Sequence, residues 1–176
     1  MKGMVFTEFL YMVADRFSEN MVDDIIEDSE LPSGGAYTSV GLYDHAEIVT
    51  LVGALSRRTG APVPDLVKAF GHHLFGRLQT IHPEFVSGID DVLDFLESVD
   101  KVIHVEVMKL YPDAMLPRFD TSREGKRLQM IYRSPRGMED LAQGLIEGCA
   151  EHFSQVLRVE RHQRPDGSTE FNLERL

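Results

Sequence analysis

The stretch VIHVEVMKLYPDAMLPRF, from Val102 to Phe119, joins a helical apolar run to a segment with two prolines and contains one histidine, His104. Apolar residues recur every three or four positions from about residue 89, and Pro112 cannot continue a helix. These patterns predict a long helix over residues 89–111. His104 stands beside its apolar stripe, so we expect the imidazole close to the core rather than in water.

A histidine close to a core needs partners for its ring nitrogens. One interpretation is a structural histidine that hydrogen-bonds to a backbone carbonyl. The other is a metal ligand, since a neutral imidazole on a rigid helix can present a nitrogen to iron or zinc. The residues three and four positions after His104 are Val107 and Met108, so this helix alone supplies no second ligand for zinc. Haem iron needs only one histidine, because the porphyrin supplies four nitrogens.

Helical periodicity also dominates the chain before this helix. Asp44 suits the N-cap of one helix, and Gly60 suits its end. Pro64 suits the first turn of the next helix, which the pair His82-Pro83 closes. The expected helices cover residues 5–17, 21–26, 43–58, 64–81, 89–111 and, later in the chain, 137–153.

Past Pro112 the pattern changes to that of strands. RFDTSREGKRLQMIYRS, residues 118–134, indicates two strands around an SREGK turn. QVLRVERHQRPDGSTEFNLERL, residues 155–176, indicates two more around a Pro-Asp-Gly turn. The sequence therefore predicts one α+β domain over residues 1–176, with an N-terminal helical part and a C-terminal four-stranded antiparallel sheet.

The charge and composition of the chain narrow the class of partner. Residues 1–100 carry six basic and seventeen acidic residues and account for the whole net charge of −11. Nucleic acid and anionic membranes attract basic surfaces, so we expect neither as a partner. No apolar run approaches the roughly 20 residues that span a bilayer. The single cysteine, Cys149, excludes an internal disulfide and makes a reducing cytoplasm the expected location.

The segment YRSPR, from Tyr132 to Arg136, is a second candidate for a site. If it ends a strand, alternation directs Tyr132, Ser134 and Arg136 to one face. Two hydroxyls and a guanidinium form a donor set for a carboxylate, which arginine can bind through two hydrogen bonds. The alternative is an ordinary strand end with a surface arginine. A haem group would use both features, because its iron binds an imidazole and its propionates bind clustered donors.

These residues resemble the haem-nitric oxide/oxygen binding (H-NOX) domain, which bacterial gas sensors share with soluble guanylate cyclase. The resemblance extends over the whole chain and rests on the order and spacing of several motifs. They are MKG at the N-terminus, KAFG at residues 68–71, His104, the L-Y-P and L-P of residues 110–117, Tyr132-x-Ser134-x-Arg136, and GLIEG at residues 144–148. The implied structure is the H-NOX fold, in which the helices and the sheet enclose haem b (iron protoporphyrin IX).

The resemblance implies a role for each matching residue. His104 would be the proximal ligand of the haem iron, and Tyr132, Ser134 and Arg136 would bind the propionates. Pro117, thirteen residues after the histidine, matches a proline that presses on the porphyrin and holds it non-planar. The matching positions of the distal pocket are Val5, Phe9, Leu74, Leu78, Leu141 and Leu145.

The distal positions decide which gas binds. Family members that hold oxygen stably have a tyrosine hydroxyl at the position of Leu141, because iron-bound oxygen needs a hydrogen-bond donor. None of the matching side chains in this sequence donates a hydrogen bond, whereas NO and CO bind ferrous haem in an apolar pocket. The resemblance therefore implies an NO sensor that also binds CO and does not hold oxygen stably.

The implied output is a conformational change rather than catalysis. In the family, NO weakens the iron–histidine bond, which would free the helix of His104 and relax the porphyrin against Pro117. The signal would pass to a separate protein, and the resemblance to standalone bacterial members implies a sensor histidine kinase or a cyclic-di-GMP enzyme. The zinc site of three cysteines and a histidine found in some relatives is missing, because Cys149 is the only cysteine.

Two other functions stay open at the level of sequence. A haem enzyme of the oxygenase or peroxidase type would use the same iron, although the matching distal positions contain no acid or base. A haem-free interaction module would use His104 and the Tyr132 cluster only as structural residues. The remaining histidines, such as His72, His73 and His82, have the pattern of ordinary helix or turn residues.

Overall fold

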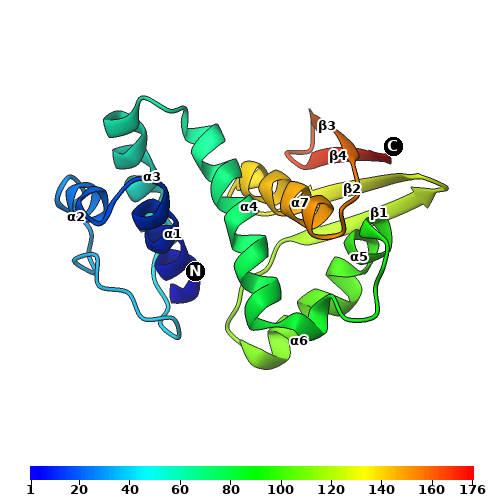
Figure 1. The fold of residues 1–176 in the computed structure, drawn as a ribbon, viewed down its shortest axis with the longest axis horizontal. Helices are drawn as coiled ribbons and strands as arrows, with labels where there is room; N and C mark the ends of the chain where they lie inside the picture. The colour runs from blue at the N-terminus through cyan, green and yellow to red at the C-terminus, as the bar shows by residue number, and fades with distance from the viewer.

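Two parts of the molecule flank the long helix α4 in the computed structural model, which describes residues 1–176 (Figure 1). The N-terminal part contains α1 (Gly3–Arg16), α2 (Glu19–Glu27) and α3 (His45–Thr59), and α4 covers Val63–Ile81. The predicted helix signals are confirmed at α3. Asp44 accepts a hydrogen bond from the N–H of Ala46 at 3.0 Å, and Gly60 ends the helix with a left-handed φ of 74°.

The core of the N-terminal part is formed by apolar side chains of α1, α2, α3 and α4. Phe9 of α1 packs edge-on against Phe70 of α4, with ring centroids 5.3 Å apart. A buried carboxylate, Glu8, accepts a hydrogen bond from Nε of Arg77 at 2.8 Å. This ion pair connects α1 to α4 beside the apolar core.

The C-terminal part is a four-stranded antiparallel sheet, as predicted, and its strands lie in the order β1-β2-β4-β3. Its strands are β1 (Arg118–Glu124), β2 (Arg127–Arg133), β3 (Leu157–Gln163) and β4 (Thr169–Arg175). Alternate residues of β2 and β4 pair across the sheet and are buried, for example Met130 opposite Phe171. These side chains pack with residues of α5 (Val92–Ser98) and α7 (Glu139–His152) in a second core.

Helices α4 and α7 lie side by side and join the two parts (Figure 1). Their close contact depends on two glycines, Gly71 and Gly144. A Cβ at Gly71 would overlap the carbonyl oxygen of Leu141, and a Cβ at Gly144 would overlap that of Lys68. Because only glycine lacks a Cβ, these positions permit an approach that any other residue would prevent.

The helix predicted over residues 89–111 starts later and is not uniform. Asp91 caps its start by accepting the N–H of Leu93 at 2.8 Å, so α5 begins at Val92. A π-helical segment, η2 (Val99–Ile103), then separates α5 from α6 (His104–Leu110). Such π segments insert an extra residue into a turn and are frequent at functional sites.

No helix of the molecule is both long enough and apolar enough to cross a membrane.

Candidate functional site

An apolar cavity of about 310 Å³ lies between the two parts of the molecule. Its walls come from α1, α4, α7, the α5–η2–α6 helix and the start of the sheet. Of its 33 lining residues 26 are hydrophobic, so it suits a ligand with a large apolar body. The volume is within the range of about 300–1,000 Å³ that is usual for cofactor and small-molecule sites. His104 and all three residues of the YRSPR donor set line it.

His104 is the first residue of α6, directly after the π-helical segment. Its side chain is 18% exposed, and Nδ1 is buried without a hydrogen-bond partner. The nearest carboxylate oxygen, Oδ1 of Asp100, lies 3.6 Å from Nδ1, which is too far for a hydrogen bond. Burial lowers the pKa of His104 below the usual histidine value, although Asp100 and the backbone carbonyl of Pro117 oppose this shift. The imidazole is therefore neutral at physiological pH, which is the form that binds iron.

A turn builds the polar end of the cavity, whereas the sequence predicted that alternation along a strand would do so. Strand β2 ends at Arg133, so only Tyr132 of the donor set belongs to it. In the turn that follows, Oγ of Ser134 accepts the N–H of Arg136 at 3.2 Å, and Nη1 of Arg136 donates to the carbonyl of Met115 at 2.9 Å. Short-range bonds from serine side chains stabilise such turns. The three side chains reach the same cavity in spite of the different local structure.

These donors are suited to carboxylates. Burial raises the pKa of Tyr132, so its phenol stays protonated and can donate a hydrogen bond. Arg136 uses one N–H for Met115 and retains others of its five donors. A neutral imidazole, an apolar cavity and a cluster of hydroxyl and guanidinium donors together fit a planar apolar group that carries a metal and carboxylates. The residues present thus fit haem.

Most of the predicted pocket residues lie on the cavity wall. Leu74 and Leu78 of α4, Leu141 and Leu145 of α7, and Val5 of α1 line it, as does Pro117 before β1. Phe9 does not line it, because its ring is fully buried in the N-terminal core against Phe70.

Four further polar residues line the wall and were not among the predicted site residues: Lys2, Gln79, His82 and Tyr111. Nδ1 of His82 lies 3.1 Å from Oε1 of Glu84, while Nε2 is buried and has no partner. The signal for His82 was its spacing, since it follows Leu78 by four residues and so extends the Leu74–Leu78 face by one more turn. The break at His82-Pro83 hid this continuity.

A family model described as Haem-NO-binding matches residues 2–161 of the chain. The chain belongs to the H-NOX family. A comparison with curated proteins gives no significant match. The family-model match and the similar structures confirm the family and the α+β fold expected from the motifs. The H-NOX family binds haem, and its members are gas sensors rather than enzymes.

Solved H-NOX structures cover the entire chain. The Fe(II) unliganded protein from K. algicida is 37% identical, with a TM-score of 0.94 over 100% of this chain and 97% of that one. The protein from Shewanella woodyi, in the Fe(II)CO state with IWP-051, is 41% identical, with a TM-score of 0.86 over 100% and 95%. The protein from S. oneidensis, in the Fe(II)NO state, is 28% identical, with a TM-score of 0.92 over 100% and 99%.

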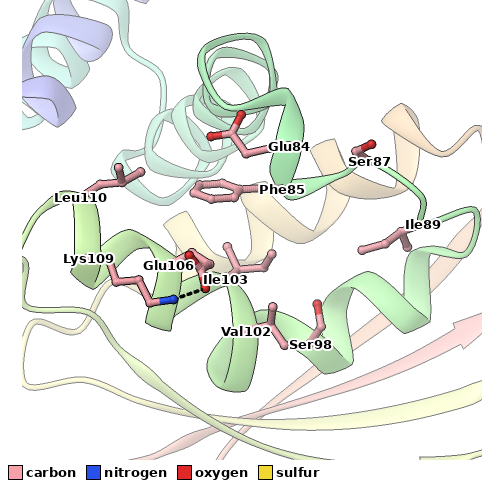
Figure 2. Close-up of a pocket in the computed structure, with 10 residues that line it drawn as sticks. All are labelled: Glu84, Phe85, Ser87, Ile89, Ser98, Val102, Ile103, Glu106, Lys109 and Leu110. Carbon is pink, nitrogen blue, oxygen red and sulfur yellow. Dashed lines mark hydrogen bonds and ion pairs between the residues drawn. The ribbon is translucent and has the colours of Figure 1, made fainter.

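The H-NOX cavity is one of two hollows beside the helix of His104. An open groove of about 690 Å³ follows the outer side of this helix, opposite the loop after α4 (Figure 2). Phe85 and Ile103 line both the groove and the cavity. Glu106 points into the groove and accepts a hydrogen bond from Nζ of Lys109 at 2.6 Å (Figure 2). The two hollows are therefore separated by only a thin layer of side chains.

Proposed function

We propose that residues 1–176 act as one H-NOX domain and as a haem-based nitric oxide sensor. In this proposal His104 is the proximal ligand of the iron, and Tyr132, Ser134 and Arg136 hold the propionates of haem b. The observation that carries it is that the imidazole and the three donors line one apolar cavity. When bound, the haem supplies a ferrous iron that takes NO or CO as a ligand.

The walls of the cavity support selection of NO and CO over oxygen. Leu141 and Leu145 of α7 and Leu74 of α4 offer no hydrogen-bond donor to an iron-bound gas. His82 is also unsuited as a donor, provided that its Nδ1–H is donated to Glu84. A neutral imidazole in that tautomer has only a lone pair at Nε2, which accepts but cannot donate.

The packing of the helix that carries His104, here called the proximal helix, supports a conformational output. None of the residues from Val99 to Leu110 is fully buried, and only Val99 and Ile103 of them pack against the second core, so few core contacts oppose movement of this segment. His104 is the tether that holds the segment on the cavity, and Pro117 lies on the same wall. We propose that release of His104 changes the outer surface of the helix and that a separate signalling protein, a sensor histidine kinase or a cyclic-di-GMP enzyme, reads this change.

The first test is the absorption spectrum of the ferrous protein under anaerobic conditions, then in air, then with NO. We expect a spectrum that air leaves unchanged and NO shifts. His104→Gly is expected to lose the histidine-ligated spectrum and to regain it with free imidazole, while His72→Gly, on a helix face outside the cavity, keeps it. If the purified protein binds no haem, the whole proposal is wrong.

Oxygen selectivity is tested separately, with a variant of the distal wall. Introducing a phenol by Leu141→Tyr is expected to create a stable oxygen complex that the wild type does not form. If the wild type already forms one, the distal-pocket argument is wrong, and Gln79→Leu would show whether that amide is the donor.

A peroxidase-type enzyme is the second candidate, and the His82–Glu84 pair favours it. An imidazole oriented by a carboxylate is the usual form of a general base, and His82 is the only imidazole on the wall besides His104. Turnover of peroxide with an ordinary reductant, abolished by His82→Leu, would replace the sensor proposal. We expect no such turnover.

A further inference from the structure

The second ring nitrogen of His104 has no partner, although it is buried. Its Nδ1 is shielded from solvent and makes no hydrogen bond. A buried polar group without a partner destabilises the folded protein, so such groups are rarely left unsatisfied. A histidine that binds a metal through one nitrogen almost always donates the other N–H to a carboxylate, a carbonyl or a water. The question is which group of this protein accepts that N–H.

Asp100 is the carboxylate that the structure brings to Nδ1. Its Oδ1 lies 3.6 Å from Nδ1 of His104, about half an ångström beyond a hydrogen bond. No other carboxylate lies within 4.0 Å of this imidazole. The backbone carbonyl of Pro117 is the other acceptor that acts on the ring, since it also opposes the lowering of the pKa of His104. Glu106 is close in sequence but points into the outer groove toward Lys109 (Figure 2).

The position of Asp100 is set from two sides. The residue belongs to the π-helical segment Val99–Ile103, whose extra residue changes the register of the turn before His104. The same Oδ1 accepts the N–H of Phe119, the second residue of β1, at 3.0 Å. Phe119 follows Pro117 by two residues, so Asp100 connects the helix of His104 to the segment that carries the proline.

We propose that Asp100 is a positioning residue for the iron ligand and accepts the Nδ1–H of His104 when Nε2 binds iron. The inference rests on the proposed haem ligation by His104 and adds the group that controls the strength of that bond. A hydrogen bond to a carboxylate is charge-assisted and raises the basicity of the imidazole. Asp100 therefore strengthens the iron–histidine bond and resists release of His104.

The geometry also gives Asp100 a second consequence. The oxygen that accepts the N–H of Phe119 would also accept the proposed Nδ1–H of His104, and β1 pairs with the strand that carries Tyr132. When His104 leaves the iron, its Nδ1–H is no longer held in place against Asp100. The start of β1 then loses a tie to the proximal helix, which couples the state of the histidine to the sheet.

The test compares Asp100→Asn with Glu106→Gln, two substitutions that each replace a carboxylate by an amide of the same size on the same helix. The readout is the iron–histidine stretching frequency of the ferrous protein by resonance Raman spectroscopy. We expect a lower frequency in Asp100→Asn and an unchanged one in Glu106→Gln. A purely structural role of Asp100 would not move this frequency, so an unchanged value in folded Asp100→Asn overturns the proposal.

A kinetic readout measures how strongly Asp100 resists the release of His104. Removal of such outer partners weakens metal binding by about 10-fold or more, so loss of the carboxylate is expected to speed the release of His104 in the presence of NO by about 10-fold. Asp100→Asn keeps a side-chain oxygen for Phe119, so we expect it to fold. Independently of any variant, NMR of the wild-type CO complex should show a slowly exchanging Nδ1–H of His104, and its absence would also overturn the proposal.

These outcomes separate the two proposals. If the wild type lacks a histidine stretching band that His104→Gly removes, the ligation by His104 itself is wrong. If that band is present and insensitive to Asp100→Asn, the ligation stands and only the role of Asp100 fails.

Discussion

The two walls of the haem cavity differ in how they are held. On the distal side, α4 and α7 pack through Gly71 and Gly144, and side chains such as Leu74 and Ile146 are buried. On the proximal side, the segment Val99–Leu110 has no fully buried residue, although it carries the proposed iron ligand. One wall is fixed by fully buried side chains, and the other is held by partly buried ones, of which Val99 and Ile103 pack against the second core.

In the proposed sensor, this difference would allow one domain to be both a rigid pocket and a switch. A site that discriminates between gases needs a wall that does not adapt, and close-packed helices provide it. A site that signals needs an element of low local stability whose position depends on the ligand. In this proposal α4 and α7 serve the first need, and the helix of His104 with its π-helical segment serves the second.

Removal of haem should produce the largest difference in local stability between the two walls. We expect amide exchange in residues 99–110 to rise by about 100-fold or more, because the ligand stabilises this segment by mass action. Residues 66–75 of α4 should change by less than about 10-fold. Hydrogen exchange of the haem-bound and haem-free proteins measures both. Equal increases in the two segments would show that the walls do not differ in stability.

Glycine substitutions on the distal wall should have an intermediate effect. Gly144→Ala places a methyl group against the carbonyl of Lys68 and is expected to destabilise the protein by about 1–3 kcal/mol. Gly76→Ala, on an open face of α4, is expected to stabilise it by about 0.5–1 kcal/mol. Val105→Ala, on the exposed side of α6, should change stability by less than about 0.5 kcal/mol. Urea unfolding compares the three, and a tolerated Gly144→Ala would contradict the tight helix contact.

Acidification should have the smallest effect and should act on the haem-free protein. Burial lowers the pKa of His104 in the folded state, so the unfolded chain binds more protons just below the usual histidine pKa of about 6.5. Stability therefore falls as the pH falls through this window. Burial also lowers the pKa of His73, which adds to the same trend. Thermal unfolding between pH 7 and 5 measures this trend as a fall in melting temperature with falling pH. His104→Gln should make that fall smaller but not remove it. An unchanged fall would show that His104 does not titrate in this range.

The sequence by itself determined the elements and most of the cavity wall. Helix ends follow from local signals such as Asp44 and Gly60, and the four strands follow from alternation around short turns, because these signals act within a few residues. The motifs also led to His104, Tyr132, Ser134 and Arg136, all of which line the cavity.

Tertiary structure decided what depends on residues far apart in the chain. The turn that orients Arg136 uses the carbonyl of Met115, and Asp100 is held by the N–H of Phe119. The burial of Phe9 behind the wall, the place of His82 on it and the π-helical segment likewise had no unambiguous local signal. Local propensity selects the helix or strand, but only packing between distant segments decides which side chains meet at the site and how firmly each is held.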